Sequence, residues 1–147
     1  MIVLRKFSPT DIQGVMQVVR GSLGEVYPAS LYLTIHNLWG DGFTVAVEDG
    51  RIVGFVAAVI PTPKTVRVLM LAVLPEQRRR SLGLRLMAEL YQCCLANGLD
   101  TITLEVRKSN MQAIAFYEHQ GFSACGEIKC FYTNGEDAQM MVKVLQS

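Results

Sequence analysis

Residues 66–87 read V-R-V-L-M-L-A-V-L-P-E-Q-R-R-R-S-L-G-L-R-L-M, which places a strand, a basic turn and a helix in immediate succession. The apolar, β-branched run that closes at Pro75 predicts a buried strand over residues 66–74. After the turn, leucines recur along one face of a helix, at Leu82, Leu86, Leu90 and Leu95. The turn between them holds the triplet Arg78, Arg79 and Arg80 and the small residues Ser81 and Gly83.

This basic turn has two features that attract an anion. A small-residue turn that enters a helix leaves backbone N–H groups unpaired at the positive end of the helix dipole. Guanidinium groups also fit phosphate oxygens, so a pyrophosphate is the simplest ligand. The alternative is an arginine triplet on a solvated surface. The turn is neither a dinucleotide fingerprint nor a P-loop, since both need more glycines.

Composition predicts one globular domain over residues 1–147 with one continuous core, because 50% of the 147 residues are apolar. The 14 basic residues nearly balance the 13 acidic ones, which gives no general drive toward nucleic acid or an anionic membrane. No apolar run approaches the ~18 residues that span a bilayer. The N-terminus turns polar at Arg5-Lys6, unlike a signal peptide. We expect a cytoplasmic protein.

The four cysteines, Cys93, Cys94, Cys125 and Cys130, form no recognisable framework. They contain no C-x-x-C, and the two histidines are not spaced as a ligand pair. We therefore predict no metal site, and we expect buried thiols in a reducing compartment.

The order of predicted elements is β-α-α-β-β-β-α-β-α-β-β, which indicates an α/β fold: a mixed sheet with helices on both faces. The hairpin signal Asp49-Gly50 joins two of the strands. Strands are expected at 2–7, 43–48, 51–60, 66–74, 101–106, 125–132 and 139–145. Helices are expected from Ser8-Pro9 to Gly21, over 29–39, from the basic turn to Asn97-Gly98, and from Asn110 to Gly121. On the helix at 29–39, the apolar side is expected to carry Leu31, Ile35 and Leu38.

Four segments resemble the GCN5-related N-acetyltransferase (GNAT) family. Residues 78–83, R-R-R-S-L-G, resemble its acetyl-CoA signature R/Q-x-x-G-x-G/A, with Ser81 where the first glycine stands. The segment L-E-V-R-K-S-N at 104–110, continued through Tyr117 to Gly121-Phe122, resembles the protein N-terminal acetyltransferases, of the RimI type and its archaeal and eukaryotic relatives. So does F-Y-T-N-G-E-D-A at 131–138. L-G-E-V-Y at 23–27 resembles their L-P-E-N-Y loop, with Gly24 and Val26 departing.

The resemblance implies the GNAT fold, with about seven strands of which the two central parallel ones, 66–74 and 101–106, splay apart. Acetyl-CoA would lie in the gap as co-substrate. The residues that would bind it are Leu71, Ala72 and Val73 on the first strand, Arg78, Arg79, Arg80, Ser81, Leu82, Gly83 and Leu84 at the turn, and Asn110 and Tyr117. Asn110 is also placed to cap its helix.

The resemblance also implies the catalytic residues. Glu105 would take a proton from the amine, directly or through water, and Tyr117 would act as general acid toward the leaving thiolate. Taken alone, Glu105 could equally be a strand carboxylate paired with Arg107 or Lys143, and Tyr117 an ordinary residue at the edge of the core. The backbone of Leu71 to Val73 would hold the acetyl carbonyl.

The expected acceptor is the α-amino group of a peptide or protein N-terminus, for which ribosomal proteins are one candidate class. Glu25, Tyr27 and Tyr132 are the predicted substrate residues; otherwise they are a solvated loop and a strand-face aromatic. Two other functions stay open: acetylation of a lysine side chain, polyamine or small-molecule amine, and a non-catalytic acyl-CoA-binding module. We expect a monomer or weak homodimer.

Overall fold

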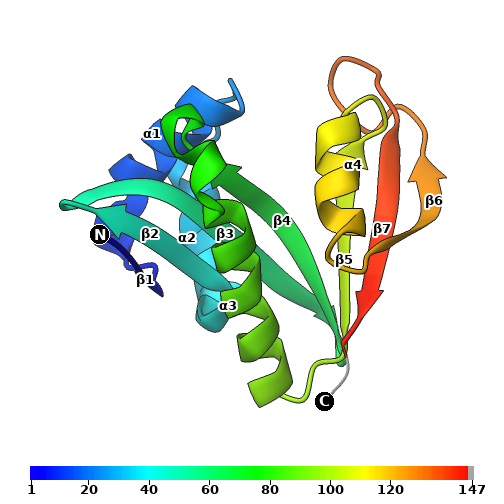
Figure 1. Ribbon diagram of the computed structural model, residues 1–147, viewed down its shortest axis with the longest axis horizontal. Coiled ribbons are helices and arrows are strands. Elements are labelled where there is room, and N and C mark those ends of the chain that lie inside the picture. Colours follow the sequence, from blue (N-terminus) through cyan, green and yellow to red (C-terminus); the bar gives the residue numbers. More distant parts are fainter. Residues whose placement is uncertain (146–147) are drawn as a thin grey trace.

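The computed structural model describes residues 1–145, without the side chains of Arg79 and Arg80, and it contains one seven-stranded sheet flanked by helices (Figure 1). The strands are β1 (Ile2–Lys6), β2 (Phe43–Glu48), β3 (Arg51–Thr62), β4 (Thr65–Val73), β5 (Thr101–Arg107), β6 (Ser123–Ile128) and β7 (Ala138–Val144). The α-helices are α1 (Ile12–Ser22), α2 (Ala29–Leu38), α3 (Leu82–Ala96) and α4 (Met111–Glu118), and short 3₁₀ turns lie at Pro9–Asp11, Gly40–Gly42 and Pro75–Arg80. This matches the predicted order of elements and the predicted fold class.

The order of strands across the sheet is β1-β2-β3-β4-β5-β7-β6, and only β4 and β5 run parallel. Their pairing is confined to residues 65–67 against 101–103. Beyond this point the two strands diverge, so the sheet opens into a V between them (Figure 1). The predicted splay of the central parallel strands is confirmed, and it divides the sheet into a β1–β4 half and a β5–β7 half.

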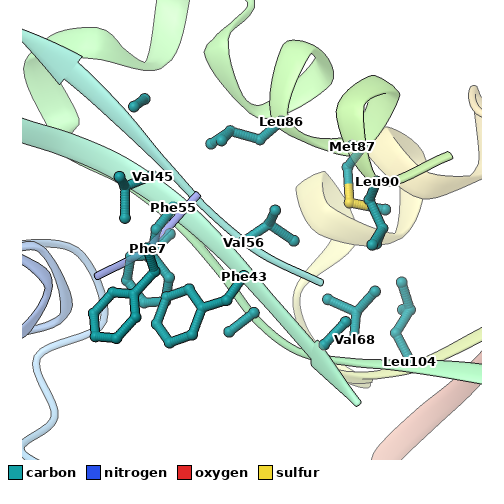
Figure 2. Close-up of a cluster of buried hydrophobic side chains, with 14 of the residues drawn as sticks. Phe7, Phe43, Val45, Phe55, Val56, Val68, Leu86, Met87, Leu90 and Leu104 are labelled. Carbon is teal, nitrogen blue, oxygen red and sulfur yellow. The ribbon is translucent and has the colours of Figure 1, made fainter. Parts of the chain in front are cut away.

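Both faces of the first half are covered. Helix α3 packs against β2, β3 and β4, and α1 and α2 pack on the opposite face (Figure 1). As a result, residues 52–58 of β3 are all buried, where a strand with one solvated face would alternate. Figure 2 shows this core, in which the rings of Phe7 and Phe43 stack with centroids 4.0 Å apart. Helix α4 belongs to the second half and is drawn in front of β5 in Figure 1.

The predicted turn between β2 and β3 is confirmed. Asp49 has φ 52° and Gly50 has φ 77°, and a type I′ turn requires positive φ at both central residues. No helix among the described residues is long and apolar enough to cross a membrane.

Three predicted strand and helix features are wrong. The strand expected at 125–132 is β6, Ser123–Ile128, because residues 129–137 form a turn in which Asp137 accepts the N–H of Cys130 at 2.9 Å. Strand β3 continues past Pro61 to Thr62, since Pro61 lies in an irregular stretch of the β3–β4 ladder. Leu95 is 37% exposed and Cys94 is buried in its place, because a helical face continues from Leu90 at the fourth residue.

Two burial predictions also need correction. Of the four cysteines only Cys94 is buried; Cys93 is half-buried, and Cys125 and Cys130 are exposed on and after the edge strand β6. On α2 the buried residues are Tyr32 and Ile35, whereas Leu38 at the end of the helix is exposed.

Candidate active site

The basic turn delivers the chain into α3 through a left-handed residue. Residues 75–80 form a 3₁₀ turn, and Ser81 then adopts φ 57° and ψ 25° before the helix starts at Leu82. The first hydrogen bond of the helix runs from the N–H of Arg85 to the carbonyl of Ser81, at 3.0 Å. The preceding N–H groups of Leu82, Gly83 and Leu84 therefore have no intrahelical acceptor and point out of the positive end of the helix.

A cavity of about 730 Å³ opens in front of this helix end. It is lined by the end of β4, by Ser81, Gly83 and Leu84, and by α4 on the far side of the gap. A Cβ on Gly83 would lie 3.3 Å from the Phe116 ring, so glycine keeps this wall open. These N–H groups, the helix dipole and the cavity in front of them fit a phosphate-bearing ligand such as acetyl-CoA.

The predicted residues of the turn play different parts. Arg78 lines the cavity, and its Nη2 donates to the carbonyl of Ser22 at 3.3 Å, which links the turn to the end of α1. Leu84 is 47% exposed at the cavity wall, whereas the Leu82 side chain is fully buried in the core, which leaves only its backbone for a ligand. The side chains of Arg79 and Arg80 lie outside the described residues.

The end of β4 presents backbone donors to the gap. The N–H of Leu74 donates to Val53 on β3 at 2.9 Å. Successive N–H groups of a strand point in opposite directions, so Ala72 also faces β3, while Leu71 and Val73 direct their N–H groups toward the side that β5 has left. Of the three residues predicted to hold the acetyl carbonyl, Leu71 and Val73 therefore direct their N–H groups into the gap, and Ala72 does not.

Helix α4 supplies the opposite wall. Asn110 caps it, since Oδ1 accepts the N–H of Ala113 at 3.1 Å, which confirms the predicted cap. The same side chain lines the cavity. Two turns further along, Tyr117 is 8% exposed, and among the described residues its hydroxyl has no hydrogen-bond partner. Burial, with a smaller effect of Tyr132, raises the pKa of Tyr117, so the phenol stays protonated and can donate.

A second cavity of about 250 Å³ lies between β4 and β5 and meets the first. The two share Leu23, Leu71, Asn110, Ala113 and Tyr117 in their linings. All three predicted substrate residues, Glu25, Tyr27 and Tyr132, line the second cavity, as does Glu105. The structure therefore brings the predicted catalytic and substrate residues to one place, next to the predicted cofactor cavity.

Glu105 projects from β5 just beyond the last paired residues. Its partner is neither Arg107 nor Lys143 but Arg67 on β4, whose Nε and Nη2 both donate to Oε1, at 3.0 and 2.6 Å. Lys143 is occupied elsewhere, because its Nζ donates to the carbonyl of Gln120. The Glu105 side chain is 8% exposed, and it lies near the bottom of the V because the β4–β5 pairing ends two residues earlier, at Thr103.

Arg107 ties together the loops that wall the second cavity. Its Nη1 donates to Asn134 and Glu136 at 3.2 Å each, and its Nη2 lies 3.5 Å from Oε1 of Glu25. The guanidinium carbon also sits 4.1 Å from the centre of the Tyr132 ring, a cation–π contact. One side chain on β5 therefore connects the α1–α2 loop with the β6–β7 loop.

The α1–α2 loop carries a paired carboxylate and phenol. The Tyr27 hydroxyl donates to Oε2 of Glu25. Burial, followed by this hydrogen bond, raises the pKa of Tyr27 to about 12. Burial also raises the pKa of Tyr132, against the opposing charge of Arg107. Both tyrosines are therefore neutral hydrogen-bonding groups at the mouth of the cavity.

Three residues of the site were not predicted: Arg67, Arg107 and Glu136. Glu136 accepts hydrogen bonds from the Ser109 hydroxyl and from Arg107, and these lower its pKa. Arg107 and Glu136 stand inside the segments L-E-V-R-K-S-N and F-Y-T-N-G-E-D-A, which could have drawn attention to them. For Arg67 the signal is its charge within an otherwise apolar run.

Comparison with known proteins adds the family. Residues 12–122 match the acetyltransferase (GNAT) family. The chain belongs to this family. An N-alpha-acetyltransferase of Saccharolobus solfataricus is 32% identical over 97% of this chain and 92% of its own length. An uncharacterised N-acetyltransferase of Methanocaldococcus jannaschii is 34% identical, over 97% and 91%. The crystal structure of Ard1 from Thermoplasma volcanium, 31% identical, superposes with a TM-score of 0.95 over 99% of both chains.

These similarities extend over nearly the whole GNAT chain, so both cavities lie inside the shared region. The family and the predicted fold are confirmed, and the chain is an N-acetyltransferase.

Proposed function

We propose that this GNAT protein transfers an acetyl group from acetyl-CoA to the α-amino group of peptide or protein N-termini. The observation that carries the proposal is the meeting of two cavities at Leu71 and Tyr117. One is built for a phosphate-bearing ligand, and the other is walled by carboxylates and tyrosines. The whole-length similarity to archaeal proteins named N-alpha-acetyltransferases supports the choice of acceptor.

When bound, acetyl-CoA supplies an activated thioester. We assign its pyrophosphate to the N–H groups at the start of α3, with Arg78 beside them, and its acetyl end to the gap between β4 and β5. The N–H groups of Leu71 and Val73 would donate hydrogen bonds to the acetyl oxygen and stabilise the negative charge that develops on it, and each such donor is worth ~3 kcal/mol in other enzymes. Asn110 would contact the arm between the two ends.

Glu105 is the proposed base. An α-ammonium group has a pKa near ~7.7–8.0, so about a quarter of N-termini are already neutral at pH 7.4, against about one lysine side chain in a thousand. The base is needed for the proton that leaves the nitrogen while the N–C bond forms, because the nitrogen carries positive charge at that stage. A carboxylate is basic enough for that step, directly or through one water. This favours an α-amine over a lysine side chain.

Tyr117 would assist the leaving sulfur. Its buried, protonated hydroxyl has no other acceptor among the described residues and lines both cavities. As the C–S bond breaks, Tyr117 would donate its phenolic proton to the sulfur, so that CoA leaves as the free thiol. The proton that Glu105 removes from the amine would then balance the proton lost by the phenol, which is restored by exchange with solvent. The transfer is direct, with no acetyl-enzyme.

Glu25, Tyr27 and Tyr132 would hold the acceptor. Glu25 offers a carboxylate to the incoming ammonium, and the two tyrosine hydroxyls can bond the peptide backbone. The cavity that they wall is about 250 Å³, and much of the rest of its lining is apolar, from β4 and β5. It would therefore enclose one residue at the N-terminus and leave the rest of the peptide outside.

Competition between matched peptides tests this proposal. One peptide carries a free N-terminus and no lysine, a second has its N-terminus blocked and an internal lysine, and each is offered with labelled acetyl-CoA. We expect the free peptide to be acetylated and the blocked peptide neither to react nor to compete. Preferred reaction of the blocked peptide would identify a lysine acetyltransferase, the second candidate left by the sequence.

A further inference from the structure

The ion pair between Arg67 and Glu105 lies where the two central strands part. Arg67 is the last β4 residue in register with β5, opposite Thr103, and Glu105 stands two residues farther along β5. Both donors of the guanidinium edge converge on one carboxylate oxygen, Oε1, at 3.0 and 2.6 Å. The pair thus bridges the bottom of the V.

The two oxygens of the Glu105 carboxylate have different surroundings. Oε1 holds both hydrogen bonds from Arg67, and no described residue bonds Oε2. Glu105 is almost fully buried and lines the acceptor cavity, whereas 39% of the Arg67 side chain is exposed. The carboxylate therefore reaches the cavity with one oxygen fixed and the other available.

The splay of β4 and β5 explains why Glu105 needs a partner that fixes its position. Beyond residue 103, β5 has no β4 partner, and the neighbouring side chains on that edge line a cavity instead of packing against one another. A glutamate side chain there has three rotatable bonds, and no packed neighbour on the open side restricts its rotamer. Two donors from a planar guanidinium hold Oε1 from two directions and thereby restrict the rotamers of Glu105 more tightly than one ammonium could.

We propose that Arg67 is a positioning residue for the reaction, which holds Glu105 so that Oε2 faces the acceptor amine. This inference rests on the proposed role of Glu105 as base. It makes two demands that a simple strand clamp would not: the effect of losing Arg67 falls on turnover, and that effect disappears when Glu105 can no longer act as base.

The test compares four variants by steady-state kinetics with a free N-terminal peptide: Arg67→Met, Arg67→Lys, Glu105→Gln and the double variant Arg67→Met/Glu105→Gln. The matched control is Arg51→Met, because Arg51 forms an exposed pair with Glu76 at 3.5 Å, outside both cavities. Binding of acetyl-CoA, measured separately for each variant, reports that the fold and the cofactor cavity are intact.

We expect Arg67→Met to lower kcat by about 100-fold, the order of effect seen when a reacting group is misplaced by 1 Å. Arg67→Lys keeps the charge but loses the planar pair of N–H donors, so its kcat should be about a tenth of that of the unaltered protein. The double variant should lie within about twofold of Glu105→Gln alone, because residues that act as a unit are not additive. Acetyl-CoA binding should be unchanged, and Arg51→Met should match the unaltered protein.

Two results would overturn the positioning role while leaving Glu105 as base. One is full turnover in Arg67→Met with a defect in Glu105→Gln, and the other is a multiplicative loss in the double variant. Loss of acetyl-CoA binding by both Arg67→Met and Arg67→Lys would assign Arg67 to the fold and also overturn it. Full turnover in Glu105→Gln would instead remove the proposed base, and the positioning role with it.

Discussion

At the scale of single residues, Ser81 shows how a departure from a family pattern is accommodated. Its φ of 57° lies in the left-handed region, which costs an L-residue about 1–2 kcal/mol and glycine almost nothing. The backbone at the turn thus keeps the conformation that glycine would adopt, and the serine side chain is exposed at the cavity wall.

Ser81→Gly should therefore stabilise the protein. After the greater entropy of glycine in the unfolded chain is subtracted, we expect the free energy of unfolding to rise by about 0.5–1 kcal/mol in urea denaturation. Gly98 provides the reverse control, with φ 70° and no atom within 4 Å of an added Cβ. Gly98→Ser should lower the free energy of unfolding by a similar amount. A destabilised Ser81→Gly protein would show that the side chain makes a contact that matters more than the strain.

Tyr117 tests the chemistry at the same scale. Replacement by Phe keeps the buried ring and removes only the hydroxyl, so acetyl-CoA affinity should change little. Loss of the donor to the leaving sulfur should lower kcat by about 100-fold, the order of effect of removing one catalytic hydrogen-bond donor. Rapid-quench kinetics and a separate binding titration distinguish the two quantities. Weaker binding at unchanged turnover would assign Tyr117 to cofactor affinity instead.

Some contacts between single residues could be predicted from the sequence and others could not. Glu105 and Tyr117 lie in segments whose order of residues is distinctive, so the sequence alone singles them out as candidates. Arg67 is 38 residues from Glu105, and nothing local pairs the two. The pairing follows from the register of two parallel strands, which depends on the whole sheet.

At the scale of secondary-structure elements, α4 depends on Asn110 for its start. The helix has only eight residues, so a cap is a sizeable part of its stability. Asn110 also lines the first cavity, to which we assign acetyl-CoA, and substitutions can separate capping from binding.

We expect Asn110→Asp to keep the cap and impair binding, since the carboxylate still accepts the N–H of Ala113 but loses the amide donor and repels phosphate. Its unfolding free energy should stay close to that of the unaltered protein while acetyl-CoA binds about tenfold more weakly. Asn110→Ala should lose about 1 kcal/mol of stability as well. Calorimetric melting and titration measure both quantities, and undiminished binding by Asn110→Asp would restrict the residue to its capping role.

Element boundaries were predictable where a local signal fixes them. Asp49-Gly50 and Asn110 act within a few residues of themselves, and both were assigned correctly. The end of β6 was not, because Cys130-Phe131-Tyr132 has strand-like composition while Asp137, seven residues away, holds Cys130 in a turn. The continuation of β3 through Pro61 was missed for a similar reason, since it depends on an irregularity in the β3–β4 ladder.

At the scale of the whole molecule, Arg107 joins three distant parts of the chain around the acceptor cavity. Its contacts reach the α1–α2 loop through Glu25 and the β6–β7 loop through Glu136 and Tyr132. Residues of both loops line the second cavity, so the relative position of the loops sets its shape.

Replacing Arg107 with Met should therefore release the two loops from each other. We expect KM for the peptide to rise about tenfold or more, as for loss of charge-assisted hydrogen bonds, while the affinity for acetyl-CoA is retained. Arg107→Lys should restore part of the effect through its charge. Initial-rate measurements with each substrate varied in turn give both constants. A rise confined to acetyl-CoA would place the function of Arg107 in the other cavity.

The most direct test of the account is the site at which the enzyme places its acetyl group. A mixed peptide library with free N-termini and internal lysines, incubated with the protein and labelled acetyl-CoA, can be read by fragment mass spectrometry. We expect label on α-amino nitrogens, within a narrow set of first residues that fit a cavity of about 250 Å³. Label confined to lysine side chains would contradict it.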